Sequence, residues 1–127
     1  MTYSLEILIL DDEREAADLL AALLALHLPT AKFHVVYTGE DAVAVGTERR
    51  PHAAILDLEM SGLGGEGAAN ALRRALQDSQ ALFIALSGNV LRLAELRKKG
   101  PFDYLLSKPV DAAVLVQLLK SKVRAVP

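Results

Sequence analysis

Three carboxylates follow short apolar runs in this 127-residue chain, and their positions indicate a cation site. Asp57 follows the run 53–56, and the adjacent Asp11 and Asp12 follow the run 5–10. Apolar runs of this length are typical of buried strands, and the carboxyl ends of parallel strands meet at one edge of a sheet. The three carboxylates should therefore converge, where they repel one another unless a cation lies among them. Oxygen ligands of this kind suit Mg²⁺.

A hydroxyl and an ammonium group are predicted at the same edge. Ser87 follows the apolar run 81–86, and Lys108 follows the strand-like segment 103–107. Asp57 is the candidate nucleophile, because a carboxylate can attack a phosphoryl group and form an acyl phosphate. Such a site must neutralise the negative charge of the transferred group, and Lys108 and Ser87 can each bind one phosphoryl oxygen.

Magnesium would neutralise most of the remaining charge. Asp12 and Asp57 are the predicted ligands, with Asp11 beside them and the backbone carbonyl of Glu59 nearby. Mg²⁺ commonly binds one or two carboxylates together with waters and phosphate oxygens, which suits a shallow open site. These residue types therefore predict magnesium-dependent phosphoryl-transfer chemistry.

The elements that must position these side chains are parallel strands joined by helices. Apolar runs of strand length alternate with longer segments of helical period. Five strand–helix units in succession predict an α/β fold, a doubly wound five-stranded parallel sheet with five helices. The predicted strands are 5–10, 32–37, 53–57, 81–86 and 103–107, and the predicted helices are 13–27, 40–49, 65–77, 90–99 and 111–124.

Capping residues support several of these boundaries. Thr38 and Asp41 have the pattern of a capping box, and Asn89 and Asp111 are suitable N-caps for the last two helices. Asp12 has the same pattern with the acid three residues later, so its alternative role is to cap the first helix.

Composition limits the classes of protein that remain. Hydrophobic residues make up 52% of the chain, which excludes a disordered segment. The net charge of −2 gives no large field to attract nucleic acid or an anionic membrane. The absence of cysteine excludes disulfides and thiolate metal sites, and we find no secretory signal or membrane span. A single soluble, cytoplasmic domain over residues 1–127 is expected.

The chain resembles the receiver domain of two-component response regulators, the CheY-like fold, over essentially its whole length. Each matching motif is short, but together and in this order, each at a strand end, they are specific. They are Asp11-Asp12, Asp57-Leu58-Glu59-Met60 with Gly65 beyond it, Ser87-Gly88 and Lys108-Pro109.

The resemblance implies a role for each of these residues. Asp57 would accept a phosphoryl group from a phosphohistidine on a sensor histidine kinase or a histidine phosphotransfer protein. Asp11 and Asp12 would organise Mg²⁺, and Lys108 and Ser87 would bind the phosphoryl group. The resemblance further implies self-catalysed phosphorylation and dephosphorylation of the aspartate, rather than turnover of a separate substrate. It also implies a Ser87-driven switch, and a cis peptide bond between Lys108 and Pro109.

Three positions depart from the family's usual pattern. Ser61 stands where proline commonly follows the Met60 position. The switch aromatic usually lies at the position of Leu105, whereas Tyr104 is one residue earlier and would lie on the opposite face of the strand. Glu59 and Asn89 flank the phosphoryl site, at positions where family members vary.

Several functions remain open at this stage. The expected function is a single-domain regulator that signals by binding an unidentified protein or by relaying the phosphoryl group. The alternatives are a receiver module from a hybrid kinase or longer regulator, and a scaffold that does not need phosphorylation. A nucleotide carrier ranks lower, although Gly62, Gly64 and Gly67 formally match a dinucleotide fingerprint.

The last two helices and the histidines raise smaller questions. Val114 and Leu118 lie beside the expected apolar stripe of the last helix, and they could form a homodimer or partner surface. The fourth helix ends in basic residues, which the helix dipole explains without nucleic acid. His27, His34 and His52 are dispersed without ligand spacing, so ordinary boundary positions are expected.

Overall fold

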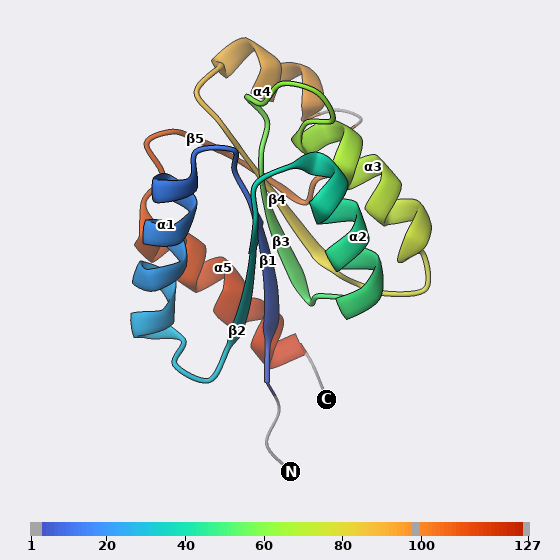
Figure 1. Ribbon diagram of the computed structural model, residues 1–127. Coiled ribbons are helices and arrows are strands. Elements are labelled where there is room, and N and C mark those ends of the chain that lie inside the picture. Colours follow the sequence, from blue (N-terminus) through green and yellow to red (C-terminus); the bar gives the residue numbers. More distant parts are fainter. Residues whose placement is uncertain (1–3, 98–99, 126–127) are drawn as a thin grey trace.

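Five short apolar segments pair as parallel strands in one sheet (Figure 1). In a computed structural model, residues 4–97 and 100–125 are described, with side-chain surroundings through residue 122. The order of strands across the sheet is β2-β1-β3-β4-β5, and every neighbouring pair is parallel. The strands are β1 Glu6–Leu10, β2 Lys32–Val36, β3 Ala53–Asp57, β4 Leu82–Ser87 and β5 Tyr104–Ser107.

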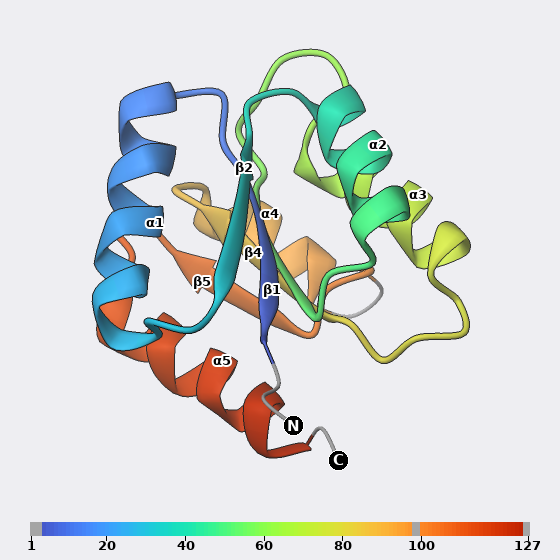
Figure 2. The same cartoon turned by 60° about the horizontal axis from the view of Figure 1, so that its bottom comes forward.

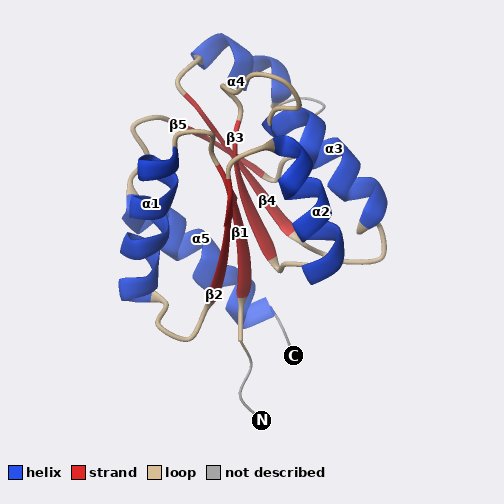
Figure 3. Ribbon diagram, viewed as in Figure 1, coloured by secondary structure: helices blue, strands red, loops and turns tan. Residues whose placement is uncertain are grey.

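Five helices connect and cover these strands, and Figure 3 shows the alternation of strand and helix along the chain. The sequence therefore predicted the fold class correctly, down to the number of strands and helices among the described residues. The helices are α1 Arg14–His27, α2 Gly39–Arg49, α3 Gly65–Ala75, α4 Val90–Leu96 and α5 Ala112–Ala125.

The helices form a layer on each face of the sheet. Helices α1 and α5 cover one face, and α2, α3 and α4 cover the other (Figures 1 and 2). Strand β1 shows why both faces are apolar, since side chains alternate between the faces of a strand. Ile7 and Ile9 pack with Leu24 on the α1 and α5 side, whereas Leu8 and Leu10 pack on the α2 and α3 side.

Most predicted boundaries agree with the structure to within a few residues. Helix α3 is two residues shorter than predicted, and Ser87 belongs to β4 instead of following it. The predicted end of the fourth helix includes Lys98 and Lys99, which lie outside the described residues. Such differences are common because helix ends fray.

The capping predictions are confirmed at three positions, and the alternative capping role considered for Asp12 is absent. The side chains of Thr38 and Asn89 accept hydrogen bonds from backbone N–H groups at the start of α2 and α4. Asp111 accepts from the N–H of Ala113. The N-cap of α1 is Glu13, not Asp12, and the Glu13 side chain makes no capping bond.

Strand β5 has the alternation that the sequence predicted. Leu105 packs against Leu58, Ala85 and Leu93 on the α4 side, while the neighbouring Leu106 packs on the α1 and α5 side. Tyr104 is 42% exposed. No aromatic side chain therefore occupies the Leu105 position, and Tyr104 does not replace it on that face.

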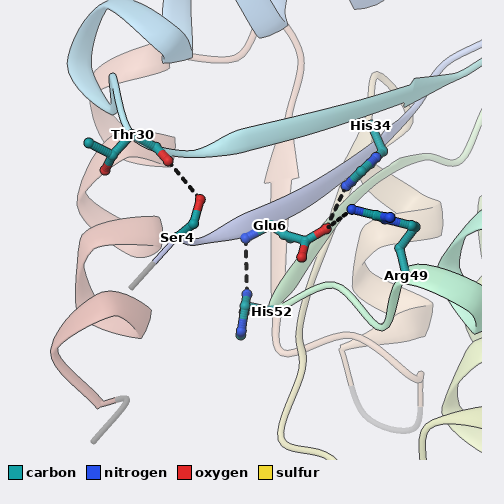
Figure 4. Close-up of polar contacts among 6 residues, drawn as sticks. All are labelled: Ser4, Glu6, Thr30, His34, Arg49 and His52. Carbon is teal, nitrogen blue, oxygen red and sulfur yellow. Dashed lines mark hydrogen bonds and ion pairs between the residues drawn. The ribbon is translucent and has the colours of Figure 1, made fainter. Parts of the chain in front are cut away.

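Two of the three histidines, which are dispersed in the sequence, contact the same residue in the fold and lie at half-buried positions. Glu6 accepts hydrogen bonds from His34 and Arg49, and its backbone N–H donates to Nδ1 of His52 (Figure 4). The bond from His34 is the main cause that lowers the pKa of Glu6. These contacts join β1, β2 and α2 near the start of β1, where they stabilise the sheet.

The surface predicted on α5 is only partly present. Val114 is exposed, but Leu118 packs against the core between α1 and α5. A charge at Leu118 would therefore disturb the core and would not test a dimer. Among the described residues, no helix has the length and apolar character needed to cross a membrane.

Candidate functional site

Two strand ends bring the three predicted acidic residues together. Leu10 of β1 lies opposite Leu56 of β3 in the sheet register, so the residues that follow them are neighbours. Carboxylate oxygens of Asp11, Asp12 and Asp57 all lie within 4.8 Å of one another. Within the described part of the chain, this is the one cluster of at least three acidic, histidine or cysteine side chains close enough to hold a metal ion.

Lys108 contacts the central acid of this cluster. Its Nζ donates a hydrogen bond of 2.8 Å to Oδ1 of Asp57, and the backbone N–H of Lys108 donates to the carbonyl of Ser87. The side chain of Asp57 is 3% exposed and that of Lys108 is 35% exposed. A buried carboxylate thus faces a half-buried cation at the sheet edge.

Burial and pairing act in opposite directions on these two groups. Burial raises the pKa of the Asp57 carboxyl, and the hydrogen bond from Lys108 opposes that rise. Burial lowers the pKa of Lys108, but the bond and charge of Asp57, with the charges of Asp11 and Glu59, outweigh it and raise that pKa. Lys108 is therefore a fixed positive charge beside Asp57.

The end of β4 adds a hydroxyl and a backbone amide. Ser87 is fully buried, and its Oγ accepts a hydrogen bond from the N–H of Asn89. The next amide, at Gly88, donates to the side-chain carboxylate of Glu59. The N–H of Glu59 in turn donates to Oδ1 of Asp57.

The sequence placed Glu59 beside the phosphoryl site but did not predict the hydrogen bond that its side chain accepts from Gly88. Only its backbone carbonyl was expected near a cation. The sequence signal was its position two residues after Asp57, since the chain turns back toward the sheet edge at that point. The carboxylate of Glu59 thus accepts the backbone N–H of Gly88, a donor at the same edge of the sheet as Asp57.

A close backbone approach explains the glycine that follows this loop. A Cβ atom on Gly65 would lie 2.3 Å from the carbonyl oxygen of Asp57. Only glycine lets α3 begin this close to the end of β3. Gly62 has a φ of +70°, and Gly64 is the N-cap of α3. Gly62 and Gly64, two glycines of the formal dinucleotide fingerprint, therefore have structural roles in the loop that follows Asp57.

The chemistry of the donors fits a hard divalent cation. The cluster offers three carboxylates and no nitrogen or sulfur ligand, which is the set that Mg²⁺ prefers. Three acids this close also need positive charge, and Lys108 contacts only Asp57 among them. The residues thus suit Mg²⁺ at this edge.

The chain belongs to the family of response regulator receiver domains, whose model matches residues 7–120. Receiver domains of this family bind Mg²⁺ in an acidic cleft and are phosphorylated by kinases. The peptide bond between Lys108 and Pro109 is cis, as the resemblance implied.

Three relatives illustrate the match. The transcriptional regulatory protein PrrA of Mycobacterium bovis is 31% identical over 119 residues, which are 93% of this chain and 49% of that protein. The receiver domain of a DNA-binding response regulator from Colwellia psychrerythraea is 25% identical, with a TM-score of 0.83 over 94% of this chain and 98% of that one. The receiver domain of sensor histidine kinase PA1611 from Pseudomonas aeruginosa is 23% identical, with a TM-score of 0.81 over 96% of this chain and 99% of that one.

These relatives differ in what surrounds the shared domain. The chain spans about half the length of the curated relatives it matches. The PA1611 domain was solved with a magnesium ion coordinated in its active-site cleft.

Proposed function

We propose that Asp57 accepts a phosphoryl group from a phosphohistidine on a sensor histidine kinase or a histidine phosphotransfer protein. The observation that carries this proposal is a buried carboxylate that contacts a cation and lies close to two more carboxylates. Lys108 lies 2.8 Å from Asp57, and the oxygens of Asp11 and Asp12 lie within 4.8 Å of an oxygen of Asp57. A buried carboxyl whose pKa is raised by burial and opposed by a cation is typical of functional sites.

Each residue has a distinct part in this transfer. An oxygen of Asp57 forms a bond to phosphorus while the phosphorus–nitrogen bond of the phosphohistidine breaks, and the histidine leaves with the electron pair. Lys108 moves from Asp57 to one phosphoryl oxygen, and the hydroxyl of Ser87 donates to another. Asp11, Asp12, Asp57 and the carbonyl of Glu59 would hold Mg²⁺, which neutralises charge on the phosphoryl oxygens when bound.

The phosphorylated chain would signal by contacting a protein or by passing the phosphoryl group onward. Ser87 and Leu105 are the residues we assign to this switch, with Tyr104 exposed beside them.

Nucleic acid is not the expected partner of this segment, because its net charge is −2. PrrA, named as a transcriptional regulator, is about twice as long as this chain, and its further part is a candidate for that role. We place the chain in the cytoplasm as a single receiver domain.

The first test is the intact mass of the protein after incubation with acetyl phosphate and Mg²⁺. We expect one added phosphoryl group, lost in Asp57→Asn and in EDTA. Asp78→Asn is a matched control, because Asp78 is exposed and pairs with Arg50 away from the site. No adduct, and no magnesium-dependent binding of beryllofluoride, would favour a scaffold that does not use phosphorylation.

A further inference from the structure

A histidine side chain joins the starts of the two neighbouring strands β1 and β3. The paired register of these strands begins at Ile7 and Ala53. One residue earlier, Nδ1 of His52 accepts the backbone N–H of Glu6 at 2.9 Å, and the N–H of His52 donates to the carbonyl of Glu6 at 2.8 Å. The imidazole ring therefore extends the hydrogen bonding between β1 and β3 by one residue.

The chain before His52 explains why a ring takes this place. Arg50 ends α2 in the left-handed conformation, with a φ of +48°, and Pro51 has no N–H to donate. The backbone thus joins the sheet at His52, whose carbonyl accepts the N–H of Leu82 at the start of β4. His52 therefore links the starts of β1, β3 and β4.

The bond from Glu6 depends on the protonation state of this ring. A ring nitrogen accepts a hydrogen bond only through a free lone pair, so Nδ1 carries no proton in this arrangement. When imidazole takes up a second proton, both of its nitrogens become donors. Nδ1 of a protonated His52 would then face the N–H of Glu6 as donor against donor, at a half-buried position. The backbone N–H would lose its acceptor.

The groups around the ring act on its pKa in both directions. Burial is the largest effect and lowers the pKa of His52, and the charge of Lys122 on α5 lowers it further. The carboxylate of Glu6 opposes both, but His34 and Arg49 already bind that carboxylate (Figure 4). Other charged residues at the amino ends of the strands are paired or exposed, namely Arg50 with Asp78, Arg73 with Asp103, Lys32 and Glu48. The neutral ring is therefore favoured near neutral pH.

We propose that this joint is an acid-sensitive switch, which holds the starts of β1 and β3 together while the ring of His52 is neutral and opens when the ring takes up a proton. The unfolded chain binds that proton more readily, because burial lowers the pKa of His52 only in the folded chain. The contribution of the joint to the free energy of unfolding is therefore complete above the ordinary pKa of 6.5 and is lost as the pH falls below it. The same two strands position the acidic cluster at their carboxyl ends.

Hydrogen exchange of single amides, read by NMR between about pH 5 and 8, tests the switch in the unsubstituted protein. We expect the protection factor of the Glu6 N–H to fall at least about five-fold at the acid end, the size of one lost hydrogen bond. The N–H of Lys32 is the matched control, because it donates at 2.8 Å to the carbonyl of Leu5 at the same end of the sheet and should keep its protection. Constant protection at Glu6, or an equal loss at Lys32, would overturn the proposal.

His52→Asn separates the proton of the ring from its role as an acceptor. The amide oxygen of asparagine can take the place of Nδ1 and accepts a hydrogen bond without titrating. The midpoint of urea denaturation should fall at acid pH in the unsubstituted protein and fall much less in His52→Asn. His34→Gln is the comparison, because its amide can still donate to Glu6, and it should keep the fall.

Two results of this comparison would contradict the switch. They are an equal fall in the unsubstituted protein and in His52→Asn, and a fall that disappears only in His34→Gln, which would assign it to the contact between His34 and Glu6. If His52→Asn does not fold, the exchange of the Glu6 N–H in the unsubstituted protein still decides. The acidic cluster titrates in all three proteins, so its effect cancels in the comparison, and none of these results depends on whether Asp57 accepts phosphate.

Discussion

The negatively charged carboxylate of Glu59 is bound to the backbone N–H of Gly88, a donor that an incoming phosphoryl oxygen would need. Gly88 lies at the end of β4, directly beside the buried Ser87. Asp57 likewise accepts from both Lys108 and the N–H of Glu59. Lys108 and the N–H of Gly88 therefore already donate to carboxylates in this structure, and phosphorylation requires them to change partners.

Replacing Glu59 by glutamine should speed phosphorylation by acetyl phosphate. The change removes one negative charge from the path of an anionic donor. At a few ångströms in a partly wet site, such a charge opposes the donor by about 1 kcal/mol, which corresponds to a rate increase of about five-fold. The rate of mass increase under limiting acetyl phosphate and saturating Mg²⁺ measures it.

Glu13→Gln is the control that separates loss of the Glu59–Gly88 contact from loss of one negative charge near the site. Glu13 is an exposed acid at the same edge of the sheet, and the N–H of Gly88 donates to Glu59 instead. We expect it to change the rate less than Glu59→Gln does. Equal rates for the two variants, or a slower rate for Glu59→Gln, would contradict the role given to the Glu59–Gly88 contact.

At the scale of elements, one arginine joins α3 to the strands at the far side of the sheet. Arg73 donates to the carbonyls of Ala81 and Pro101 and to the carboxylate of Asp103, and its guanidinium stacks over the ring of Phe83. Asp103 also accepts the N–H of Phe83. These contacts fix the entries of β4 and β5, and thereby the strand ends that carry Ser87 and Lys108.

Arg73→Lys should destabilise the domain by about 1–3 kcal/mol. A lysine cannot reproduce the planar fork that reaches three acceptors, and partly buried carbonyls would lose their donors. Urea denaturation measures the change. Arg74→Lys provides the comparison, because Arg74 is exposed on the same turn, and we expect its effect to stay within about 0.5 kcal/mol. Similar losses in both variants would show that Arg73 acts only as a surface charge.

Local patterns explain which elements could be predicted from the sequence. The caps at Thr38 and Asn89 depend on residues three positions apart, and the strand ends depend on runs of five or six residues. The contacts that the sequence did not reveal join distant segments. Glu59 and Gly88 are 29 residues apart, and Arg73 and Asp103 are 30 apart. Leu118 was misplaced because a helical pattern alone does not give the width of the buried stripe on α5.

On the scale of the whole molecule, the site is built from the ends of three strands. Asp11 and Asp12 follow β1, Asp57 ends β3, and Lys108 follows β5. No single helix or strand forms the site. A cation that binds there binds only the folded chain, so its affinity adds to the free energy of unfolding of the entire domain.

Mg²⁺ should therefore raise the melting temperature of the unphosphorylated protein. At a Mg²⁺ concentration ten times the dissociation constant, the gain is about 1.4 kcal/mol. For a domain of this size that corresponds to about 4–8 °C, and EDTA should reverse it.

Asp12→Asn removes one of the three crowded carboxylates, so it should raise the melting temperature without metal and reduce the shift that Mg²⁺ produces. Asp78→Asn should keep the full shift, since Asp78 lies outside the cluster. Scanning calorimetry measures the melting temperature, and a KCl control at matched ionic strength separates specific binding of Mg²⁺ from a general salt effect. An equal shift with KCl, or an undiminished shift in Asp12→Asn, would mean that Mg²⁺ does not bind at this cluster.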